Sequence, residues 1–363
     1  MEAFLREQTL HFSRWYDVVC VSSPGPEHAS MRAEGICTHE IPIARPIRPW
    51  QDVRSLWALW RYFRRERPDI VHSLTPKAGL LGMAAAWLAR VPVRVHTFTG
   101  LLFPYKRGVL RRILLATDRL TCFFATHLNP EGQGVRHQLQ QARITAKELT
   151  VIGHGNIHGV NVEAYRPRGE RGAARAGLGI APGAFVLAFT GRLVGDKGVN
   201  ELVAAFCALA GAHPELELLL IGHEEPELDP LLPETQRLLR DHPRIHFIGY
   251  RRDVPTLLEA ADAFVFPSYR EGFPNALLEA MAMQLPCIAT DICGCQEIIT
   301  SGENGILIPA RDAAAVEKAM AQLLAMPSAE REKMGAAARR HIETRYSFRY
   351  VSEQLHQYYE TIA

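Results

Sequence analysis

The chain has 363 residues, of which 47% are hydrophobic and 22% are charged; this is enough for two domains with separate cores and is an ordinary composition for an α/β protein. Residues 1–168 carry 23 Lys and Arg against 13 Asp and Glu. The first half of the chain is therefore basic and the remainder is acidic, although the net charge of the whole chain is only +2. The excess positive charge of the first half predicts an anionic binding partner. The longest apolar run, 78–89, is too short to span a bilayer, and the first residues lack a signal-peptide pattern, so we expect a cytoplasmic protein.

Short apolar runs and helical periodicities alternate along the chain. The expected strands are 17–23, 69–73, 91–97, 185–189, 217–221, 245–248, 263–266 and 286–289. The expected helices include 51–66, 78–90, a helix that begins at Val199, and 347–362. This alternation is typical of parallel, doubly wound sheets, so the sequence predicts an α/β fold.

A hinge is expected at the Gly- and Asn-rich stretch 153–161, which is followed by turn-forming residues. We therefore place a first domain at 1–168, a second domain at 169–346 and a final helix at 347–363.

No metal site and no cofactor are expected. The seven cysteines lack zinc-ligand spacing, and most lie among apolar neighbours, where cysteine acts as a small hydrophobe. Cys293 and Cys295 form the one tight pair, for which a redox or metal role is the minor alternative. No Asp-x-Asp pair or His/Cys cluster stands out in the sequence.

Two carboxylates, Glu271 and Glu279, flank a Gly-Phe-Pro turn that leads into an apolar helix. Because proline favours the first turn of a helix, we expect the helix to begin near Pro274, with its free amides directed at Gly272 and Phe273. One acid then lies at the mouth of an anion-binding helix, and the other lies about 8 Å along its flank. A sugar nucleotide, with a central diphosphate and hydroxyl-rich ends, suits this pattern. The alternative is that Glu271 caps the helix and Glu279 faces solvent.

A second strand–loop–helix unit lies upstream, where the apolar strand 185–189 ends at Gly191 and helical spacing begins at Val199. Arg192 and Lys197 occupy the loop among glycines, which allow close approach of the backbone. A guanidinium and an ammonium can neutralise a diphosphate whose charge grows as a glycosidic bond breaks. The alternative is that both bases only solvate a turn.

Three motifs follow one another in the second half: Gly191-Arg192-Leu193 with Lys197-Gly198, Phe247-Ile248-Gly249 with Asp253-Val254-Pro255, and Glu271-Gly272-Phe273 with Glu279-Ala280-Met281-Ala282. Together they resemble the family 4 retaining glycosyltransferases of the GT-B fold. Residues 71–79 and 153–160 add a narrower likeness to bacterial members that extend polyprenyl-diphosphate-linked glycans for capsule, O-antigen or exopolysaccharide.

The resemblance implies two Rossmann-like, doubly wound domains that face a cleft, with the C-terminal helix crossing back to the first domain. It implies that a sugar moves, with retention of configuration, from a nucleotide-sugar, expected to be a UDP-sugar, to a lipid-linked glycan. Arg192 and Lys197 would hold the diphosphate. Glu279 would accept hydrogen bonds from ribose hydroxyls, and Glu271 would bind sugar hydroxyls and stabilise positive charge at the anomeric carbon. The other donor-binding residues implied are Gly191, Gly272, Phe273, Pro274 and Asn275.

The chain departs from the family at its start. Family members usually open with a strand and a Gly-rich loop, whereas residues 3–8 already have the pattern of the helix that follows. Either the first domain lacks this strand or the true start lies upstream, and we favour the second explanation.

Candidate acceptor- or sugar-binding residues lie in the first domain. His72 follows a strand, a favoured ligand position in open α/β sheets. Lys77 either reaches an acceptor phosphate or is an exposed lysine at a helix start. Some family members have a histidine in the loop after the strand 91–97; here either His96 or Thr99 stands near that place, and His96 alternatively points into the sheet.

Aromatic and basic residues are interleaved at 50–67 and 103–112. Part of each segment belongs to the core, and the exposed remainder fits binding to anionic headgroups. We therefore expect a peripheral protein on the inner face of the cell membrane, with a polyprenyl-diphosphate-linked sugar as acceptor. Nucleic acid is not an expected partner, because no RNA- or DNA-binding motif is visible.

Two other functions remain as alternatives. A GT-B sugar-nucleotide 2-epimerase shares the fold and the donor, but it does not need a basic, aromatic first domain. A non-catalytic sugar-nucleotide-binding scaffold in a polysaccharide assembly complex is not expected to keep Arg192, Lys197, Glu271 and Glu279 together. Sugar transfer is therefore the preferred hypothesis.

Overall fold

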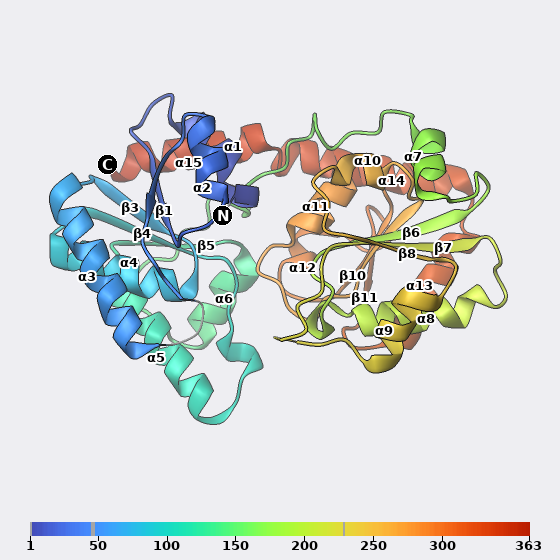
Figure 1. The fold of residues 1–363 in the computed structure, drawn as a ribbon, viewed down its shortest axis with the longest axis horizontal. Helices are drawn as coiled ribbons and strands as arrows, with labels where there is room; N and C mark the ends of the chain where they lie inside the picture. The colour runs from blue at the N-terminus through green and yellow to red at the C-terminus, as the bar shows by residue number, and fades with distance from the viewer. Residues whose placement is uncertain (1, 45–47, 228) are drawn as a thin grey trace. The chain divides into compact units, whose positions relative to one another are not determined.

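The computed structural model describes residues 2–44, 48–227 and 229–363, and the chain divides into two compact units (Figure 1). Unit 1 combines Met1–Gly159 with Arg349–Ala363, and unit 2 is Val160–Phe348. The first division falls inside the expected hinge, ahead of the expected boundary at 168, and the second returns the last helix to unit 1.

Unit 1 is an α/β unit with parallel strands. Its strands are β1 (Val19–Ser22), β2 (Cys37–Glu40), β3 (Ile70–Ser73), β4 (Val93–Phe98) and β5 (His127–Pro130). Its helices are α1 (Glu2–Phe12), α2 (Glu27–Ala33), α3 (Pro49–Glu66), α4 (Pro76–Ala89), α5 (Gly108–Phe124), α6 (Gln133–Gln141) and α15 (Phe348–Ile362). Figure 1 has α3, α4 and α5 on one side of the strands and α1, α2 and α15 on the other.

The sheet of unit 1 is in two parts. β1 pairs with β2, and β4 lies between β3 and β5. Among the described residues no ladder joins β1 to β3, and the first element is the helix α1, as the sequence predicts.

The C-terminal helix packs on unit 1. Leu355 of α15 forms a buried cluster with Phe12 of α1 and with Ile152, and Tyr358 and Tyr359 pack against this cluster. The final helix therefore crosses back to the first unit, which is the arrangement that the GT-B resemblance implies.

Unit 2 has a continuous, parallel sheet in the order β11-β10-β9-β6-β7-β8. Its strands are β6 (Phe185–Thr190), β7 (Leu216–Ile221), β8 (Ile245–Gly249), β9 (Ala263–Phe266), β10 (Cys287–Thr290) and β11 (Ile306–Ile308). Its helices are α7 (Arg171–Leu178), α8 (Val199–Ala210), α9 (Pro233–Asp241), α10 (Val254–Leu258), α11 (Asn275–Ala282), α12 (Cys295–Ile298), α13 (Ala313–Ala325) and α14 (Ser328–Arg345). In Figure 1, α8, α9 and α13 cover one face, and α10, α11 and α14 cover the other.

The strands of unit 2 are apolar because helices cover both faces of the sheet. All 6 residues of β6 and all 4 of β9 are buried. β6, the first strand of the unit, lies beside β9, the fourth, so the direction of winding reverses between them. In open α/β sheets, ligands bind outside the carboxyl ends of the strands at such a switch point.

Two loops leave the sheet at this switch point, and their backbones touch. Gly198, after β6, has a φ of +71°, and a Cβ atom there would lie 2.1 Å from the carbonyl oxygen of Pro267, which follows β9. Gly222, after β7, is similarly close to the β6 loop, because a Cβ atom would lie 1.7 Å from the carbonyl oxygen of Gly191. Only glycine fits at these positions, so the contacts fix the paths of the loops.

Gly198→Ala should lower the free energy of unfolding more than Gly179→Ala does. Gly179 has nearly the same φ, +70°, but nothing lies within 4 Å of an added Cβ, so this control reports the strain of a left-handed backbone alone, about 1–2 kcal/mol. Overlap with Pro267 should add about 1–3 kcal/mol at Gly198. Chemical denaturation measures both losses, and equal losses would contradict the contact.

Candidate functional site

The two loops at the switch point are joined by hydrogen bonds as well as by close packing. After β6 the chain forms a short 3-10 turn, Gly195–Lys197. The carbonyl oxygen of Asp196 in this turn accepts a hydrogen bond of 2.8 Å from the amide of Tyr269 in the β9 loop. The first loop carries Arg192 and Lys197, so the structure brings the basic motif against the segment that leads to the acidic one.

Lys197 and Glu271 form an ion pair between the loops. The Lys197 Nζ atom donates to Glu271 Oε1 at 2.5 Å and lies 5.7 Å from the centre of the Phe266 ring. The two side chains are 17% and 13% exposed, so water screens the pair weakly and either charge alone would be costly to bury. Two residues that the sequence predicts for one site, 74 positions apart, therefore meet.

Arg192 is paired with a carboxylate that no sequence motif marks. Its Nη1 atom donates to Glu225 Oε2 at 2.6 Å, and its side chain is 39% exposed. The hydrogen bond from Arg192 lowers the pKa of Glu225 below its ordinary value. Glu225 follows β7, the neighbour of β6 in the sheet. The one signal that could have indicated Glu225 is this strand adjacency, which the sequence does not display.

Arg270 forms a third cation–carboxylate pair, 2.5 Å from Asp196. Each of the three cations, Arg192, Lys197 and Arg270, thus faces a carboxylate. A diphosphate that binds Arg192 or Lys197 therefore competes with a carboxylate for the same N–H groups.

The acidic motif leads into α11, which begins at Asn275 with Pro274 as its N-cap, within one residue of the predicted start. Gly294 lies against the preceding turn, since a Cβ atom there would be 2.4 Å from the carbonyl oxygen of Gly272. Phe273 is buried, with 6% of its surface exposed. The turn is therefore held firmly, and the amides of a first helical turn, which lack partners within the helix, attract anions.

Glu279 lies half-buried on the flank of α11, and the hydroxyl of Tyr165 donates a hydrogen bond to it. Burial raises the pKa of this carboxyl to about 7, although the Tyr165 hydrogen bond acts in the opposite direction. Hydrogen-bond donors favour the charged form of such a carboxyl. Its position and its chemistry therefore suit the predicted role of binding ligand hydroxyls.

In unit 1, both ring nitrogens of His72 are already engaged. Nδ1 lies 2.6 Å from the hydroxyl oxygen of Tyr359, and Nε2 lies 2.7 Å from Oγ1 of Thr97. Burial and the neighbouring His158 lower the pKa of His72 to about 4, so the ring is neutral at physiological pH. His72 thus joins β3 to β4 and to α15.

His96 points into the core of unit 1. It is 2% exposed, its Nδ1 atom lies 2.8 Å from Ser73 Oγ, and a Cβ atom at Gly79 of α4 would be 2.4 Å from its ring. Burial lowers its pKa to about 3. Thr99 donates to the Leu74 carbonyl at 3.1 Å, and it lines a small cavity at the end of β4 together with His96 and Asp118.

Lys77, the remaining candidate in unit 1, connects α4 to neighbouring segments. Its Nζ atom lies 2.5 Å from Asp52 of α3 and donates to the carbonyl oxygen of Ala44 at 2.7 Å. The charge of Lys77 is therefore neutralised by a carboxylate within unit 1.

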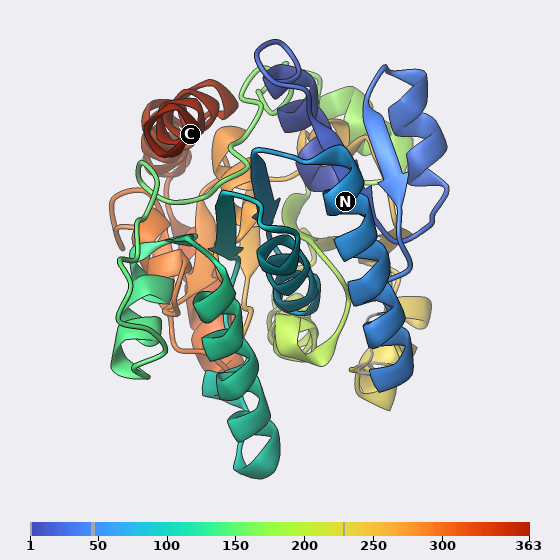
Figure 2. The ribbon, with the colours of Figure 1, turned by 90° about the vertical axis from the view of Figure 1, so that its left-hand side faces the viewer.

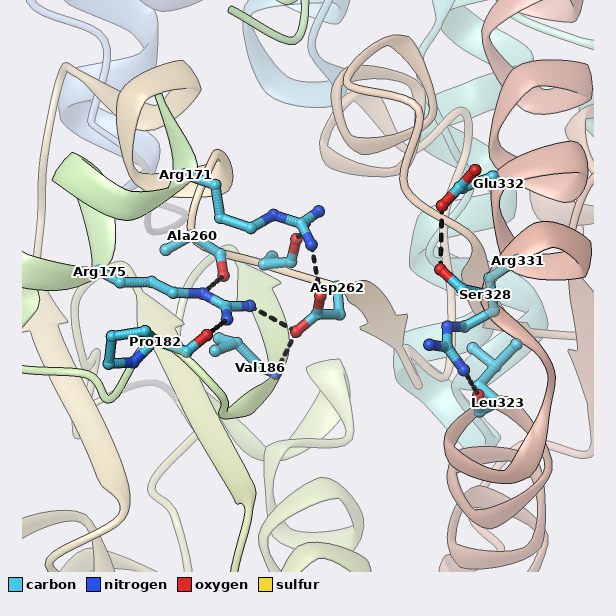
Figure 3. A network of polar contacts seen from close by, with 11 residues as sticks. Arg171, Arg175, Pro182, Val186, Ala260, Asp262, Leu323, Ser328, Arg331 and Glu332 are labelled. Carbon is cyan, nitrogen blue, oxygen red and sulfur yellow. Dashed lines mark hydrogen bonds and ion pairs between the residues drawn. The ribbon is translucent and has the colours of Figure 1, made fainter. Parts of the chain in front are cut away.

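A cavity of about 190 Å³ lies at the opposite ends of the strands, where β9 and β10 begin. Figure 3 shows the polar network beside it, in which Arg171 and Arg175 of α7 meet Asp262 at 2.7 and 2.6 Å. On the far side, Ser328 donates to Glu332 at 2.9 Å. The arginine–Asp262 contacts hold α7 against the start of β9, and the Ser328–Glu332 hydrogen bond lies within the first turn of α14. We therefore interpret this network as structural.

In the part of the chain that the structure describes, no three His, Cys, Asp or Glu side chains are grouped so that they could hold a metal ion. None of the described helices has both the length and the apolar character to cross a membrane. Cys295 is a buried free thiol. Burial, together with the nearby charge of Glu271, raises the pKa of the Cys295 thiol far above its ordinary value.

The sequence matches two family models, described as "Glycosyl transferase 4-like domain" over residues 5–155 and "Glycosyl transferases group 1" over residues 170–341. The capsular polysaccharide biosynthesis glycosyltransferase CapM of Staphylococcus aureus is 30% identical over 361 residues, which cover 99% of this chain and 92% of that protein. The UDP-Gal:alpha-D-GlcNAc-diphosphoundecaprenol alpha-1,3-galactosyltransferase of Escherichia coli is 30% identical over 284 residues, which cover 74% of this chain and 70% of that protein.

Solved structures share the fold. Anabaena Alr3699/HepE in complex with UDP and glucose has a TM-score of 0.83 at 20% identity, covering 98% of this chain and 95% of that one. Sucrose-phosphate synthase from Thermosynechococcus elongatus has a TM-score of 0.80 at 22% identity, covering 98% of this chain and 91% of that one. The fold of the present chain is therefore the GT-B fold.

Glu279→Gln should flatten the pH dependence of stability. Because the folded-state pKa near 7 exceeds the ordinary value of 4.5, the folded protein binds this proton more tightly than the unfolded chain does. The resulting stabilisation is complete below the ordinary pKa and is lost as the pH rises through the folded-state pKa. The wild-type free energy of unfolding should therefore fall, relative to that of the variant, between about pH 5 and pH 8.

Chemical denaturation across this pH range measures the difference. Glu330→Gln, which neutralises an exposed carboxylate on α14, is the control and should follow the wild type. Parallel pH courses for the wild type and Glu279→Gln would contradict the raised pKa.

Proposed function

Since the chain belongs to the glycosyl transferases group 1 family, with a glycosyl transferase 4-like domain in its first half, we propose that it transfers a sugar from a UDP-sugar to a lipid-linked glycan in surface polysaccharide biosynthesis, with retention of anomeric configuration. The observation that carries the proposal is the Lys197–Glu271 pair beside Arg192 at the switch point of unit 2.

Arg192 and Lys197 are assigned to the diphosphate of the donor, together with the backbone at Gly191 and the amides at the start of α11. Glu279 is assigned to the ribose hydroxyls. Glu271 is assigned to hydroxyls of the donor sugar, from where its charge stabilises positive charge at the anomeric carbon. The half-buried positions of Lys197 and Glu271 support these roles, because electrostatic interactions are stronger away from bulk water.

In the proposed reaction, the bond between the anomeric carbon and the diphosphate breaks, and its electron pair goes to the leaving phosphate oxygen. Fixed cations and helix-end amides stabilise the added charge. The acceptor hydroxyl oxygen bonds to the anomeric carbon on the face from which the diphosphate departs, and its proton passes to the departing diphosphate. This scheme assigns no step to a metal ion or a cofactor.

The nucleotide and the acceptor are proposed from the similar proteins. The relative from Escherichia coli is named for UDP-Gal and for a diphosphoundecaprenol acceptor, and the relative from Staphylococcus aureus is named for capsular polysaccharide. A structure with the same fold holds UDP and glucose. A diphosphate in the donor also agrees with the two cations of the β6 loop.

A membrane-bound acceptor agrees with the surface of unit 1. The helices α3 and α5 expose large apolar side chains, including Trp50 (85%), Trp57 (55%), Val109 (71%) and Phe123 (63%). Figure 2 shows α5 reaching beyond the strands of unit 1. Exposed bases on the same helices are Arg54, Arg61, Arg64, Arg65, Arg111, Arg112 and Arg119. We assign these residues, together called the basic–aromatic surface, to contact with anionic headgroups.

Lys197→Ala and Arg192→Ala should each lower kcat about a hundredfold, because the loss of one contact to charge that develops in the transition state costs on the order of 3 kcal/mol. The assay follows sugar transfer from a panel of UDP-sugars in excess EDTA. Lys318→Ala, which removes an exposed base on α13, should leave kcat unchanged. Wild-type turnover in either site variant would contradict the assignment of Arg192 and Lys197 to the diphosphate. An absolute need for a divalent ion would contradict the metal-free scheme.

The full chain should sediment with anionic vesicles and not with neutral ones, with binding that weakens steeply as salt is added. Reversing two bases of the basic–aromatic surface, Arg111→Glu with Arg112→Glu, should weaken vesicle binding about tenfold or more, because each base near an anionic surface contributes about 1 kcal/mol.

The matched control reverses two exposed bases on α9 of unit 2, Arg237→Glu with Arg240→Glu, and should bind like the wild type. Equal recovery with neutral and anionic vesicles, or full activity on a water-soluble sugar with none on a lipid-linked one, would reject the membrane assignment.

A further inference from the structure

The described residues that follow β7, 223–227 and 229–232, hold the β6 loop at several places. We call them the β7 segment. Its contacts with the β6 loop and the start of α8 are Leu193 amide to His223 carbonyl (2.8 Å), Arg192 to Glu225 (2.6 Å), Asp196 amide to Asp229 carboxylate (2.6 Å) and Leu232 amide to Asn200 side chain (3.0 Å).

Glu225 differs from the other groups of the β7 segment because it neutralises a cation. The path of the β6 loop is already fixed by the main-chain contacts and by the Asp229 carboxylate, so the loop does not need Glu225 for its shape. The Glu225 side chain is 17% exposed, whereas that of Arg192 is 39% exposed. The carboxylate therefore lies on the protein side of the pair, and the guanidinium is the partner that faces water and incoming anions.

The guanidinium can change partners without a change in the backbone. An arginine side chain has five N–H donors in a planar fork, and the hydrogen bond to Glu225 uses Nη1. Rotation about the half-exposed Arg192 side chain is sufficient to turn the fork from a carboxylate to a phosphate, since both are anions that match its geometry.

We propose that Glu225 is an internal counter-ion of Arg192 that the donor diphosphate replaces, and that it thereby lowers the affinity of the site for anions that bind Arg192, the donor diphosphate included. This inference rests on the proposed function. A small anion that displaces Glu225 gains one or two contacts, whereas a nucleoside diphosphate also gains Lys197 and the contacts of its nucleoside. The displacement of Glu225 costs both ligands the same free energy, so the ligand with the additional contacts is the one that keeps a high net affinity.

The test is calorimetric binding of UDP and of inorganic pyrophosphate to the full chain. Glu225→Gln keeps an oxygen that accepts a hydrogen bond from Arg192 but removes the charge. It should bind UDP about three- to fivefold more tightly, the range expected for a partly exposed ion pair, and pyrophosphate more tightly by about the same factor. In turnover, the change should appear in KM for the donor rather than in kcat.

Three further variants isolate the charge on Glu225. Glu225→Asp keeps the charge and should show no gain. Glu343→Gln, which removes a carboxylate 2.7 Å from Arg339 on α14, controls for the loss of an ion-paired charge elsewhere in unit 2 and should bind like the wild type. In an Arg192→Gln background, Glu225→Gln should give no gain, because the effect acts through Arg192. Thermal unfolding of each variant confirms that it is folded.

UDP binding that is unchanged or weaker in Glu225→Gln would overturn the counter-ion role and leave Glu225 as a support for Arg192. An equal gain in the Arg192→Gln background would overturn it as well. Failure of the wild type to bind UDP would instead overturn the proposed function, and pyrophosphate binding would then still decide whether Glu225 competes for Arg192.

Discussion

The adjacency of β6 and β9 in the sheet of unit 2 is the constraint on which the candidate site depends. It places the two loops side by side, and the contact between Gly198 and Pro267 leaves no room for a side chain between them. Lys197 and Glu271 are consequently held 2.5 Å apart, although 74 residues separate them in the chain. The positions of the charged groups therefore follow from backbone packing rather than from the ion pair itself.

Under the proposed function, the same charged groups contribute to both stability and binding. Half-buried cations are costly without partners, and the carboxylates of Glu225 and Glu271 stabilise Arg192 and Lys197 in the folded protein. When a diphosphate binds, the cations exchange carboxylate partners for phosphate partners. The affinity for the diphosphate is therefore the difference between the free energy of the new contacts and that of the carboxylate contacts that are lost. The Glu279 carboxyl differs from these pairs, because burial raises its pKa to about 7 and no cation compensates its charge in the contacts that shift this pKa.

The sequence predicted the apolar strands β6 to β10 of unit 2 and the start of α11, because apolar runs and a proline are local signals. β2 (CTHE) and β5 (HLNP) were not predicted because neither is an apolar run, and β11 was not predicted because it has only 3 residues. The basic and acidic motifs could be placed after strands because each follows an apolar run, whereas their role in donor binding stays a prediction. The partners of His72, Lys77 and Arg192 could not be predicted, because they come from other segments; Tyr359, for example, lies 287 positions from His72.

Hydrogen–deuterium exchange of the full chain with and without UDP tests most directly whether the switch point of unit 2 is the donor site. The account predicts that bound UDP slows exchange in peptides covering 191–198 and 271–279. It predicts no change around 258–262 and 283–286, which line the cavity at the opposite ends of the strands. Slower exchange at that cavity, or bound UDP that leaves 191–198 and 271–279 unchanged, would contradict the account.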